Sequence, residues 1–188
     1  TAEKRKELKI PENATIYMTV CELIPRKNID TIIKAFKKAN IRNSYLIVCG
    51  DGNYKEELQD LIVREKLDER VKLLGFRSDI AELLCVADVF VFPTKQEGLP
   101  GALMEAMAVG LPCVASNIRG NTDLLGEDYR YLLDPMDIEA WAKGLNEILK
   151  DKKTCGIYCR EQIKKFDIQK AIENYAGVYK VIPGGHVL

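Results

Sequence analysis

Two glutamates that stand eight residues apart, Glu97 and Glu105, are the side chains whose spacing points most clearly to chemistry. Glu105 belongs to the segment 101–109, in which every other residue is apolar or glycine. We expect that segment to be a helix buried on all sides, where an ionised carboxylate needs a group that hydrogen-bonds to it. That group is either an internal Lys or Arg or a bound ligand, and Glu105 alone does not decide between them.

The residues between the two glutamates predict a site for an anion. Pro100 is typical of a first helical turn and Gly110 of the position after a helix, so we expect a helix over 100–109. The first N–H groups of a helix lack partners and carry partial positive charge; here they belong to Gly101, Ala102 and Leu103. Carboxylates on both sides of such a site suit a ligand whose hydroxyl groups flank a phosphate.

Two further loops could bind phosphate. Arg26 and Lys27 directly precede a predicted helix, as in a phosphate clamp, although a solvated charged turn explains them too. The turn Gly50-Asp51-Gly52 would let a ligand approach the backbone. However, Lys55 stands where the dinucleotide fingerprint needs a third glycine, and no Walker sequence occurs, so nicotinamide enzymes and P-loop nucleotidases are disfavoured.

Short apolar runs alternate with helical patterns along most of the chain. We predict strands at 16–21, 46–49, 71–74, 89–92, 113–115 and 131–133, and helices at 29–36, 54–66, 80–84, 100–109, 137–150, 155–166 and 168–181. Asp79 and Glu82 are spaced as a capping box for the third helix. The alternation predicts an α/β fold with a doubly wound, Rossmann-like, parallel six-stranded sheet and helices on both faces, which binds ligands beyond the carboxyl ends of its strands.

The length of 188 residues suits one domain with added elements. We expect a linker at 1–14, the domain at 15–181 and a flexible tail at 182–188. Trp141 falls on the apolar stripe of its helix and should be core.

Composition excludes several classes of protein. Twenty-eight basic and 28 acidic residues balance, so nothing indicates a nucleic-acid partner. The single histidine, His186, rules out a His-based triad or a multi-histidine metal site within this chain, and we expect no metal. Six cysteines form no Cys-x-x-Cys pair; Cys21, Cys49 and Cys113 should be buried thiols. Apolar runs are too short for a membrane helix and no secretion signal is visible, so we expect a cytoplasmic protein.

The motifs carry a family resemblance. Glu97-Gly98-Leu99-Pro100 followed by Glu105-Ala106-Met107-Ala108 resembles the Glu-x(7)-Glu signature of the retaining family 4 (group 1) glycosyltransferases of the GT-B fold. The Lys-Asn, Cys-Gly-Asp-Gly, Leu-Gly-Phe-Arg-Ser-Asp and Ala-Asp-Val-Phe-Val-Phe-Pro stretches agree in order over about 15–150. Residues 116–124 look like those of bacterial surface-polysaccharide members.

The resemblance implies a role for each matching residue. Glu105 would accept hydrogen bonds from the ribose of the donor nucleotide, and Glu97, the catalytic candidate, from the donor sugar, while helping to stabilise positive charge at the anomeric carbon. Lys27 would neutralise the leaving diphosphate without a metal cofactor. Backbone groups would hold the rest of the donor: Gly50, Phe76, Arg77, Gly98, Leu99, Gly101, Ala102 and Leu103.

Two departures from the family pattern stand out. Cys21-Glu22-Leu23 occupies the place of the usual Gly-Arg-Leu, which reverses a charge at the phosphate clamp; Arg26 and Arg119 are the candidates to replace the lost cation. Some polysaccharide-assembly members resemble this chain in having Glu there, so inactivity does not follow. In addition, the motifs are those of the C-terminal, donor-binding half of a GT-B enzyme.

We therefore expect the donor-binding domain of an enzyme that moves a sugar, from a UDP-sugar in our preferred interpretation, to a glycan or lipid-linked acceptor. The acceptor half would lie outside this chain, which alone would transfer little, and the full-length enzyme could contact a membrane peripherally. Two alternatives stay open: half of a nucleotide-sugar epimerase, disfavoured by the lack of histidines near the site, and a non-catalytic nucleotide-binding or interaction module, favoured by Glu22.

Overall fold

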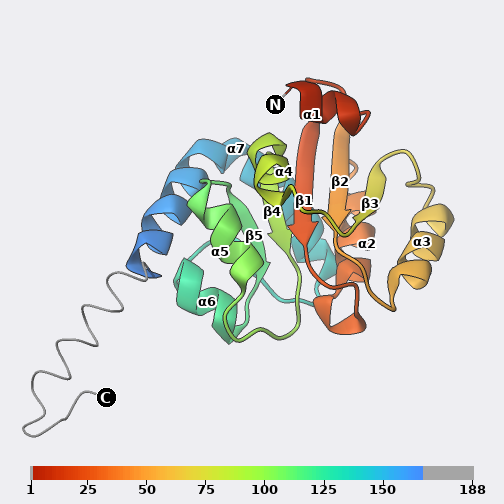
Figure 1. Cartoon of the computed structure of the whole chain (residues 1–188). Coiled ribbons are helices and arrows are strands. Elements are labelled where there is room, and N and C mark those ends of the chain that lie inside the picture. Colours follow the sequence, from red (N-terminus) through yellow and green to blue (C-terminus); the bar gives the residue numbers. More distant parts are fainter. Residues whose placement is uncertain (1, 167–188) are drawn as a thin grey trace, which may run out of the picture.

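A computed structural model of the protein describes residues 2–166, in which all six strands form one parallel sheet. The strand order is β3-β2-β1-β4-β5-β6, which is a doubly wound sheet with its switch point between β1 and β4. The prediction of a Rossmann-like sheet is therefore confirmed (Figure 1). The strands are β1 (Thr15–Val20), β2 (Ser44–Cys49), β3 (Val71–Gly75), β4 (Val89–Phe92), β5 (Cys113–Ser116) and β6 (Leu132–Leu133).

The central strands are buried on both faces, as their apolar composition predicts. In β4 every residue of the sequence Val-Phe-Val-Phe is buried, and β1 pairs with it through Tyr17 opposite Val89. A strand between two helical layers needs apolar side chains on both sides of its pleat, because neither side faces water. The hydroxyl of Tyr17, a polar group within this apolar region, donates a 2.8 Å hydrogen bond to the carbonyl of Leu145.

Helices cover both faces of the sheet. In the view of Figure 1, α4 and α5 lie in front of the sheet and α2 lies behind it, packed against the first half of α7. Trp141 of α7 is fully buried, as predicted. The helices are α1 (Ala2–Glu7), η1 (Pro25–Lys27), α2 (Ile29–Ala39), α3 (Lys55–Arg64), α4 (Ile80–Val86), α5 (Gly101–Ala108), α6 (Arg119–Leu125), α7 (Ile138–Ile163) and η2 (Lys164–Phe166).

The C-terminal part differs from the prediction of separate helices over 137–150 and 155–166. One helix, α7, runs without a break for 26 residues. The polar stretch that suggested a gap is held in place by side chains. Asp151 accepts a 2.5 Å hydrogen bond from the hydroxyl of Tyr131, and Lys152 pairs with Asp88 at 2.5 Å. The helix predicted over 168–181 and the tail 182–188 lie outside the described residues.

The N-terminal segment that we predicted as a linker contains α1 and contributes to the core. Leu8 and Ile10 are buried against the rest of the domain. The guanidinium of Arg5 donates to the carbonyls of Ala14 and Val86 at 2.6 and 2.9 Å and pairs with Asp88. Helix α6 was also not predicted, since its Gly-Asn-Thr sequence is weak in helix propensity. Tertiary contacts thus determine both short helices.

A buried asparagine, Asn28, ties together three loops at the carboxyl edge of the sheet. Its backbone is left-handed, with φ of 60°, between η1 and α2. The side-chain amide donates to the carbonyls of Pro93 and Pro135 at 2.9 and 2.7 Å, and Thr31 donates to its oxygen at 2.9 Å. Since Asn28 is completely buried, each of these groups would otherwise be left without a partner.

Replacing Asn28 by Ala should therefore lower the free energy of unfolding by about 2–4 kcal/mol, because the buried carbonyl of Pro93 and the partly buried carbonyl of Pro135 lose their donor. Asn43→Ala is the matched control: Asn43 also has positive φ (49°), but its amide donates from an exposed position to the carbonyl of Asn13. We expect its loss to stay near 1 kcal/mol, roughly the backbone cost of Ala at positive φ. Urea unfolding of both variants measures the difference, and equal losses would contradict this role for Asn28.

Candidate functional site

A cavity of about 480 Å³ opens at the carboxyl ends of β1, β2 and β4. The loop after β3 and the first turn of α5 complete its wall. This is the edge at which a doubly wound sheet binds its ligands, and the volume lies within the range of small-molecule sites. Its lining comprises Val20, Cys21, Glu22, Lys27, Cys49, Gly50, Asp51, Phe76, Arg77, Ile80, Phe92, Glu97, Pro100, Gly101 and Ala102.

The floor of the cavity is made by two loops in very close contact. A Cβ on Gly50 would lie 1.8 Å from the carbonyl oxygen of Cys21, and the φ of Gly50 is +133°. No other residue type fits there. The ladder of the sheet continues into this contact, because the N–H of Cys21 donates to the carbonyl of Cys49 at 3.0 Å. Glycine at position 50 is thus required by this backbone contact, and its N–H donates to the carbonyl of Gly75 at 2.8 Å.

Two thiols, Cys21 and Cys49, border the cavity without being suited to nucleophilic attack. Burial raises the pKa of each to about 12, so both are protonated and neutral near pH 7. Both are free thiols, as is Cys113. Cys49 and Cys113 are buried as predicted, whereas Cys21 is only half-buried because it faces the cavity.

The centre of the site is an ion pair between Lys27 and Glu97, whose side chains are 14% and 13% exposed. Lys27 also faces the ring of Phe92, with its nitrogen 5.9 Å from the centroid. The hydroxyl of Thr94 donates to the paired oxygen of Glu97 at 3.1 Å, and Arg26 lies 3.9 Å from it. The two residues for which the sequence predicted separate roles are therefore direct partners.

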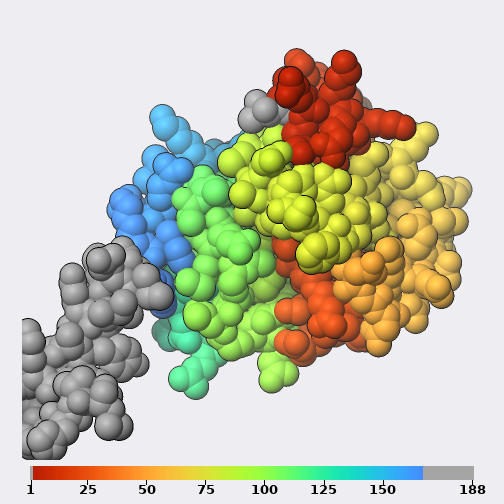
Figure 2. Space-filling model, viewed as in Figure 1, coloured from red at the N-terminus to blue at the C-terminus, as the bar shows by residue number. Residues whose placement is uncertain are grey.

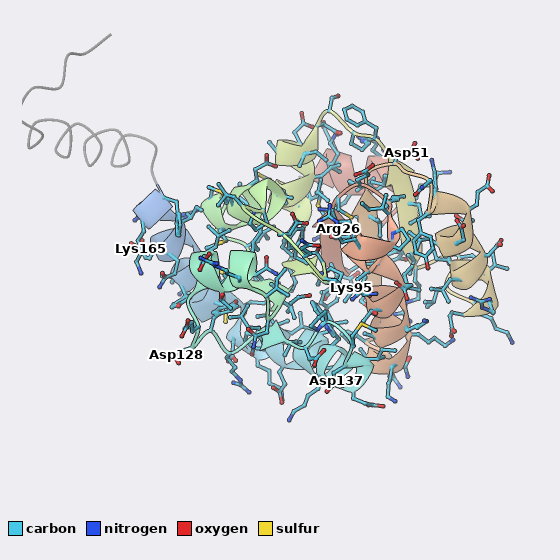
Figure 3. The ribbon with its side chains drawn as sticks, turned by 90° about the horizontal axis from the view of Figure 1, so that it is seen from below. Arg26, Asp51, Lys95, Asp128, Asp137 and Lys165 are labelled. Atoms are coloured by element: carbon cyan, nitrogen blue, oxygen red, sulfur yellow. The ribbon has the colours of Figure 1, made fainter. Side chains whose placement is uncertain are left out.

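The loops that carry this pair are joined through their backbones. The N–H of Lys95 donates to the carbonyl of Arg26 at 2.9 Å, and the guanidinium of Arg26 donates to the carbonyl of Gln96 at 2.6 Å. Figure 3, which looks onto this edge of the sheet, shows Arg26 between the labelled Asp51 and Lys95. The position of Glu97 thus depends on the loop after β1 as well as on its own.

Helix α6 supports the same loop from behind. A Cβ on Gly120 would lie 2.6 Å from the carbonyl oxygen of Gly98 and 2.7 Å from that of Glu97, so only glycine allows this approach. The neighbouring Arg119 extends into solvent, with 95% of its side chain exposed and Asp123 3.9 Å away. Arg119 does not line the cavity, and among residues 2–166 its ion pair is this exposed contact with Asp123.

The prediction that α5 is buried on all sides is wrong. Gly101, Glu105 and Ala108 are exposed, and among residues 2–166 no cation pairs with the Glu105 carboxylate. The reason is geometric: Leu103, Ala106 and Met107 face the core, whereas no element within residues 2–166 covers the opposite stripe. The burial argument for a ligand on Glu105 therefore fails. The remaining argument for a ligand on Glu105 is its position, since Glu105 lies one turn beyond Gly101, which lines the cavity.

The other predicted residues are divided between the rim and the core. Phe76 and Leu99 are 82% and 65% exposed, and Phe76 and Arg77 line the cavity. The side chain of Leu103 is fully buried, so only its backbone could reach a ligand. No side chain caps the N-terminus of α5, which leaves its first N–H groups available, as predicted.

Acidic groups in the cavity include one that we did not predict. Asp51 accepts a 2.9 Å hydrogen bond from the N–H of Gly52 and pairs with Lys55 at 3.3 Å; the first of these contacts, with help from the second, lowers the pKa of Asp51. The sequence signal that could have identified Asp51 is its place between two glycines, in the turn Gly50-Asp51-Gly52. Glu22, by contrast, lines the cavity without an ion pair among residues 2–166.

The capping box predicted at the start of α4 does not form. No side chain caps this helix. Asp79 instead accepts hydrogen bonds from the guanidinium of Arg77 at 2.7 and 2.6 Å, and this contact holds the pKa of Asp79 well below its usual range. A neighbouring cation therefore outcompetes the backbone N–H groups for this carboxylate.

We predict that Gly120→Ala lowers the free energy of unfolding by about 2 kcal/mol, because the added methyl overlaps two backbone carbonyls of the Glu97 loop. Gly101→Ala is the control: a Cβ there has no heavy atom within 4 Å, and Ala is the better helix former, so we expect a change of under about 1 kcal/mol in the stabilising direction. Urea unfolding checks both, and a Gly120→Ala variant as stable as Gly101→Ala would refute the contact.

Comparisons with known proteins identify relatives of this chain. The family described as "Glycosyl transferases group 1" matches residues 1–166. An Escherichia coli UDP-Gal:alpha-D-GlcNAc-diphosphoundecaprenol alpha-1,3-galactosyltransferase is 32% identical over 94% of this chain and 48% of its own. The N-acetyl-alpha-D-glucosaminyl L-malate synthase of Bacillus anthracis is 26% identical over 93% and 48%. This chain thus spans about half the length of the curated relatives it matches.

Solved structures share the fold. Anabaena Alr3699/HepE in complex with UDP superposes with a TM-score of 0.87, at 24% identity, over 96% of this chain and 52% of that one. A sucrose-phosphate synthase from Thermosynechococcus elongatus gives 0.82, at 26% identity, over 96% and 48%. Within residues 2–166 no helix is long and apolar enough to cross a membrane, and no group of three or more His, Cys, Asp or Glu is placed to hold a metal ion.

Proposed function

This chain belongs to the group 1 glycosyl transferases, and on that premise we propose that it binds the donor, a nucleotide-diphosphate sugar, for a retaining sugar transfer. The observation that carries the proposal is the Lys27–Glu97 pair, which lies beside the uncapped N-terminus of α5 in a cavity at the carboxyl edge of the sheet. A cation, free N–H groups and a carboxylate are what a diphosphate joined to a sugar requires.

The geometry gives a route by which the pair would act. When a diphosphate enters, Lys27 would turn from Glu97 to the phosphate oxygens, and the N–H groups of α5 would add their partial positive charge. Glu97 would then accept hydrogen bonds from sugar hydroxyls in place of the ammonium, with Thr94 still holding the carboxylate. As the leaving diphosphate gains negative charge, Lys27 would stabilise it without rearranging further.

The rest of the donor would extend in two directions. Glu105 continues the face of α5 that lines the cavity at Gly101, so a ribose diol placed there would donate to it. Phe76 offers an exposed ring beside Arg77 on the wall opposite, where a base would stack. We propose uridine as the base because a relative's name includes UDP-Gal and Alr3699/HepE was solved with UDP.

The acceptor would bind to another part of the enzyme. Since the chain spans about half of its relatives, we propose that a second domain supplies the acceptor site, and that this chain alone binds donor but transfers little sugar. A glycan or lipid-linked acceptor is our expectation because one relative's name specifies a diphosphoundecaprenol compound. Robust transfer by the purified chain would overturn this division.

One observation favours a second candidate function. Glu22, which has no ion pair among residues 2–166, places a carboxylate where the donor's phosphates would lie, and this weakens anion binding. A non-catalytic interaction module that kept the fold would tolerate this. The family match itself favours the transferase over half of an epimerase.

The first test is a thermal-shift panel of UDP-, GDP- and ADP-sugars. We expect a UDP-sugar to raise the melting temperature, since ligand at 100 times its Kd stabilises the folded state by about 2.7 kcal/mol. Glu105→Ala should reduce the shift only slightly at the same concentration, because its carboxylate is exposed and a hydrogen bond to it competes with water. Glu69→Ala, an exposed acid that precedes β3 at the opposite edge of the sheet, should leave it intact. A panel without any response would exclude donor binding.

A second test asks which cation replaces the family's usual arginine. Arg26 lies 3.9 Å from Glu97, and the exposed side chain of Arg119 adjoins the Gly120 contact, so we expect at least one Ala variant to weaken UDP binding roughly tenfold through loss of a charge-assisted contact. Arg42→Ala, exposed before β2, is the matched control. Calorimetry that shows unchanged affinity in both Arg26→Ala and Arg119→Ala would eliminate these candidates.

A further inference from the structure

The N-terminal helix reaches the wall of the cavity through Arg77. This arginine lines the cavity, and its Nε and Nη2 donate to the two oxygens of Asp79 at 2.7 and 2.6 Å. Nη2 also donates to the carboxylate of Glu7, at the end of α1, at 2.7 Å. A residue 70 positions away in the chain thus helps to hold a cation at the candidate donor site.

A second cation of α1, Lys4, pairs with acidic residues at the start of α4. The ammonium of Lys4 lies 2.7 Å from Asp79, 2.9 Å from Glu7 and 2.9 Å from Glu82. We name these five residues, Lys4, Glu7, Arg77, Asp79 and Glu82, the Arg77 brace. Figure 2 shows the same arrangement at the surface, where the red N-terminal segment rests on the yellow-green atoms around α4. The helix is also held by its apolar side, through Leu8 and Ile10.

The charges of the brace are mutually supporting. Hydrogen bonds from Arg77 and then from Lys4 hold the pKa of Asp79 and that of Glu7 below their ordinary values. Contacts with the same acids raise the pKa of Arg77 and of Lys4. All four groups therefore stay ionised at neutral pH, and the guanidinium is fixed in one plane by two carboxylates.

This arrangement leaves one end of Arg77 available. Nε and Nη2 are occupied, whereas no acceptor within residues 2–166 pairs with Nη1. A guanidinium that is oriented in advance binds an acceptor more tightly than a free one, because less conformational entropy is lost on binding. The brace therefore presents a fixed donor at the cavity, next to the exposed ring of Phe76.

We propose that Glu7 and Asp79 are positioning residues of the donor site, which act by orienting Arg77, and that the docking of α1 is thereby coupled to nucleotide binding. The inference rests on the proposed function, since it assumes that the cavity takes a nucleotide. Coupling is reciprocal: a nucleotide that engages Arg77 stabilises α1 on the domain, and loss of the α1 contact frees Arg77 and weakens the nucleotide.

The test is a double-mutant cycle on UDP affinity, measured by calorimetry at low salt with the 188-residue chain. Glu7→Gln should weaken UDP binding about fivefold, at the low end of coupling between sites. In an Arg77→Met background the same change should have no further effect, because Glu7 acts only through Arg77. Added salt should shrink the Glu7 effect, since Glu7 is 46% and Arg77 27% exposed.

The matched control is Glu3→Gln, which makes the same charge change in α1 at a residue without an ion pair to the rest of residues 2–166. It should leave UDP affinity unchanged. Hydrogen exchange supplies a second measurement that needs no variant: UDP should slow exchange in α1 of the native chain. The inference would be overturned if Glu7→Gln weakened UDP binding equally in the native and the Arg77→Met backgrounds. It would also be overturned if UDP left hydrogen exchange in α1 unchanged.

The failure of the proposed function gives a different result. If the native chain does not bind UDP at all, the proposed function fails and the inference fails with it. If UDP binds to the native chain and Glu7→Gln binds it equally well, only the coupling through α1 is wrong.

Discussion

The ion pair between Lys27 and Glu97 is the contact on which the geometry of the site depends. It joins the loop after β1 to the loop after β4. These two strands flank the switch point, at which the strand order of the sheet reverses. The first of these loops is anchored in the core by Leu23, whose side chain is fully buried. Asn28 and Gly120 hold the backbones of both loops in place, and the pair satisfies two charges that are mostly withdrawn from water. Breaking one partner would leave the other charge partly buried and unpaired.

Each member of this pair can exchange its partner for a group of the donor when a donor binds. A diphosphate offers Lys27 a new anion, and sugar hydroxyls offer Glu97 new donors, so neither group loses its partner when a donor enters. The net free energy of binding is then a difference between two sets of polar contacts. Glu22 makes the binding of any anion in the cavity less favourable, whereas Arg26, which already lies close to Glu97, makes it more favourable. Substitutions of these neighbours should therefore change the affinity for the donor more than substitutions in the buried core do.

The sequence predicted what depends on local pattern and missed what depends on distant partners. Apolar runs such as Val89–Phe92 specify strands because both faces of a parallel sheet are buried. Asp79 has the spacing of a helix cap, yet its carboxylate pairs with Lys4, which lies 75 positions away in the sequence, as well as with the nearby Arg77. Glu105 lies in an apolar segment, yet nothing covers its side of α5. Burial and ion pairing are set by tertiary neighbours, which no residue spacing reveals; the roles given to these side chains stay predictions.

The exposure of Glu105 changes how the donor site must work under the proposed function. A hydrogen bond from a ribose to a solvated carboxylate competes with water and adds little net free energy. Phe76, which lines the cavity, and Leu99, next to Pro100 of the lining, are exposed as well, so the cavity is open to solvent. A second domain that covered the rim would exclude water and strengthen each polar contact beneath it. The contribution of Glu105 would then depend on closure, whereas that of the Lys27–Glu97 pair, already withdrawn from water, would not.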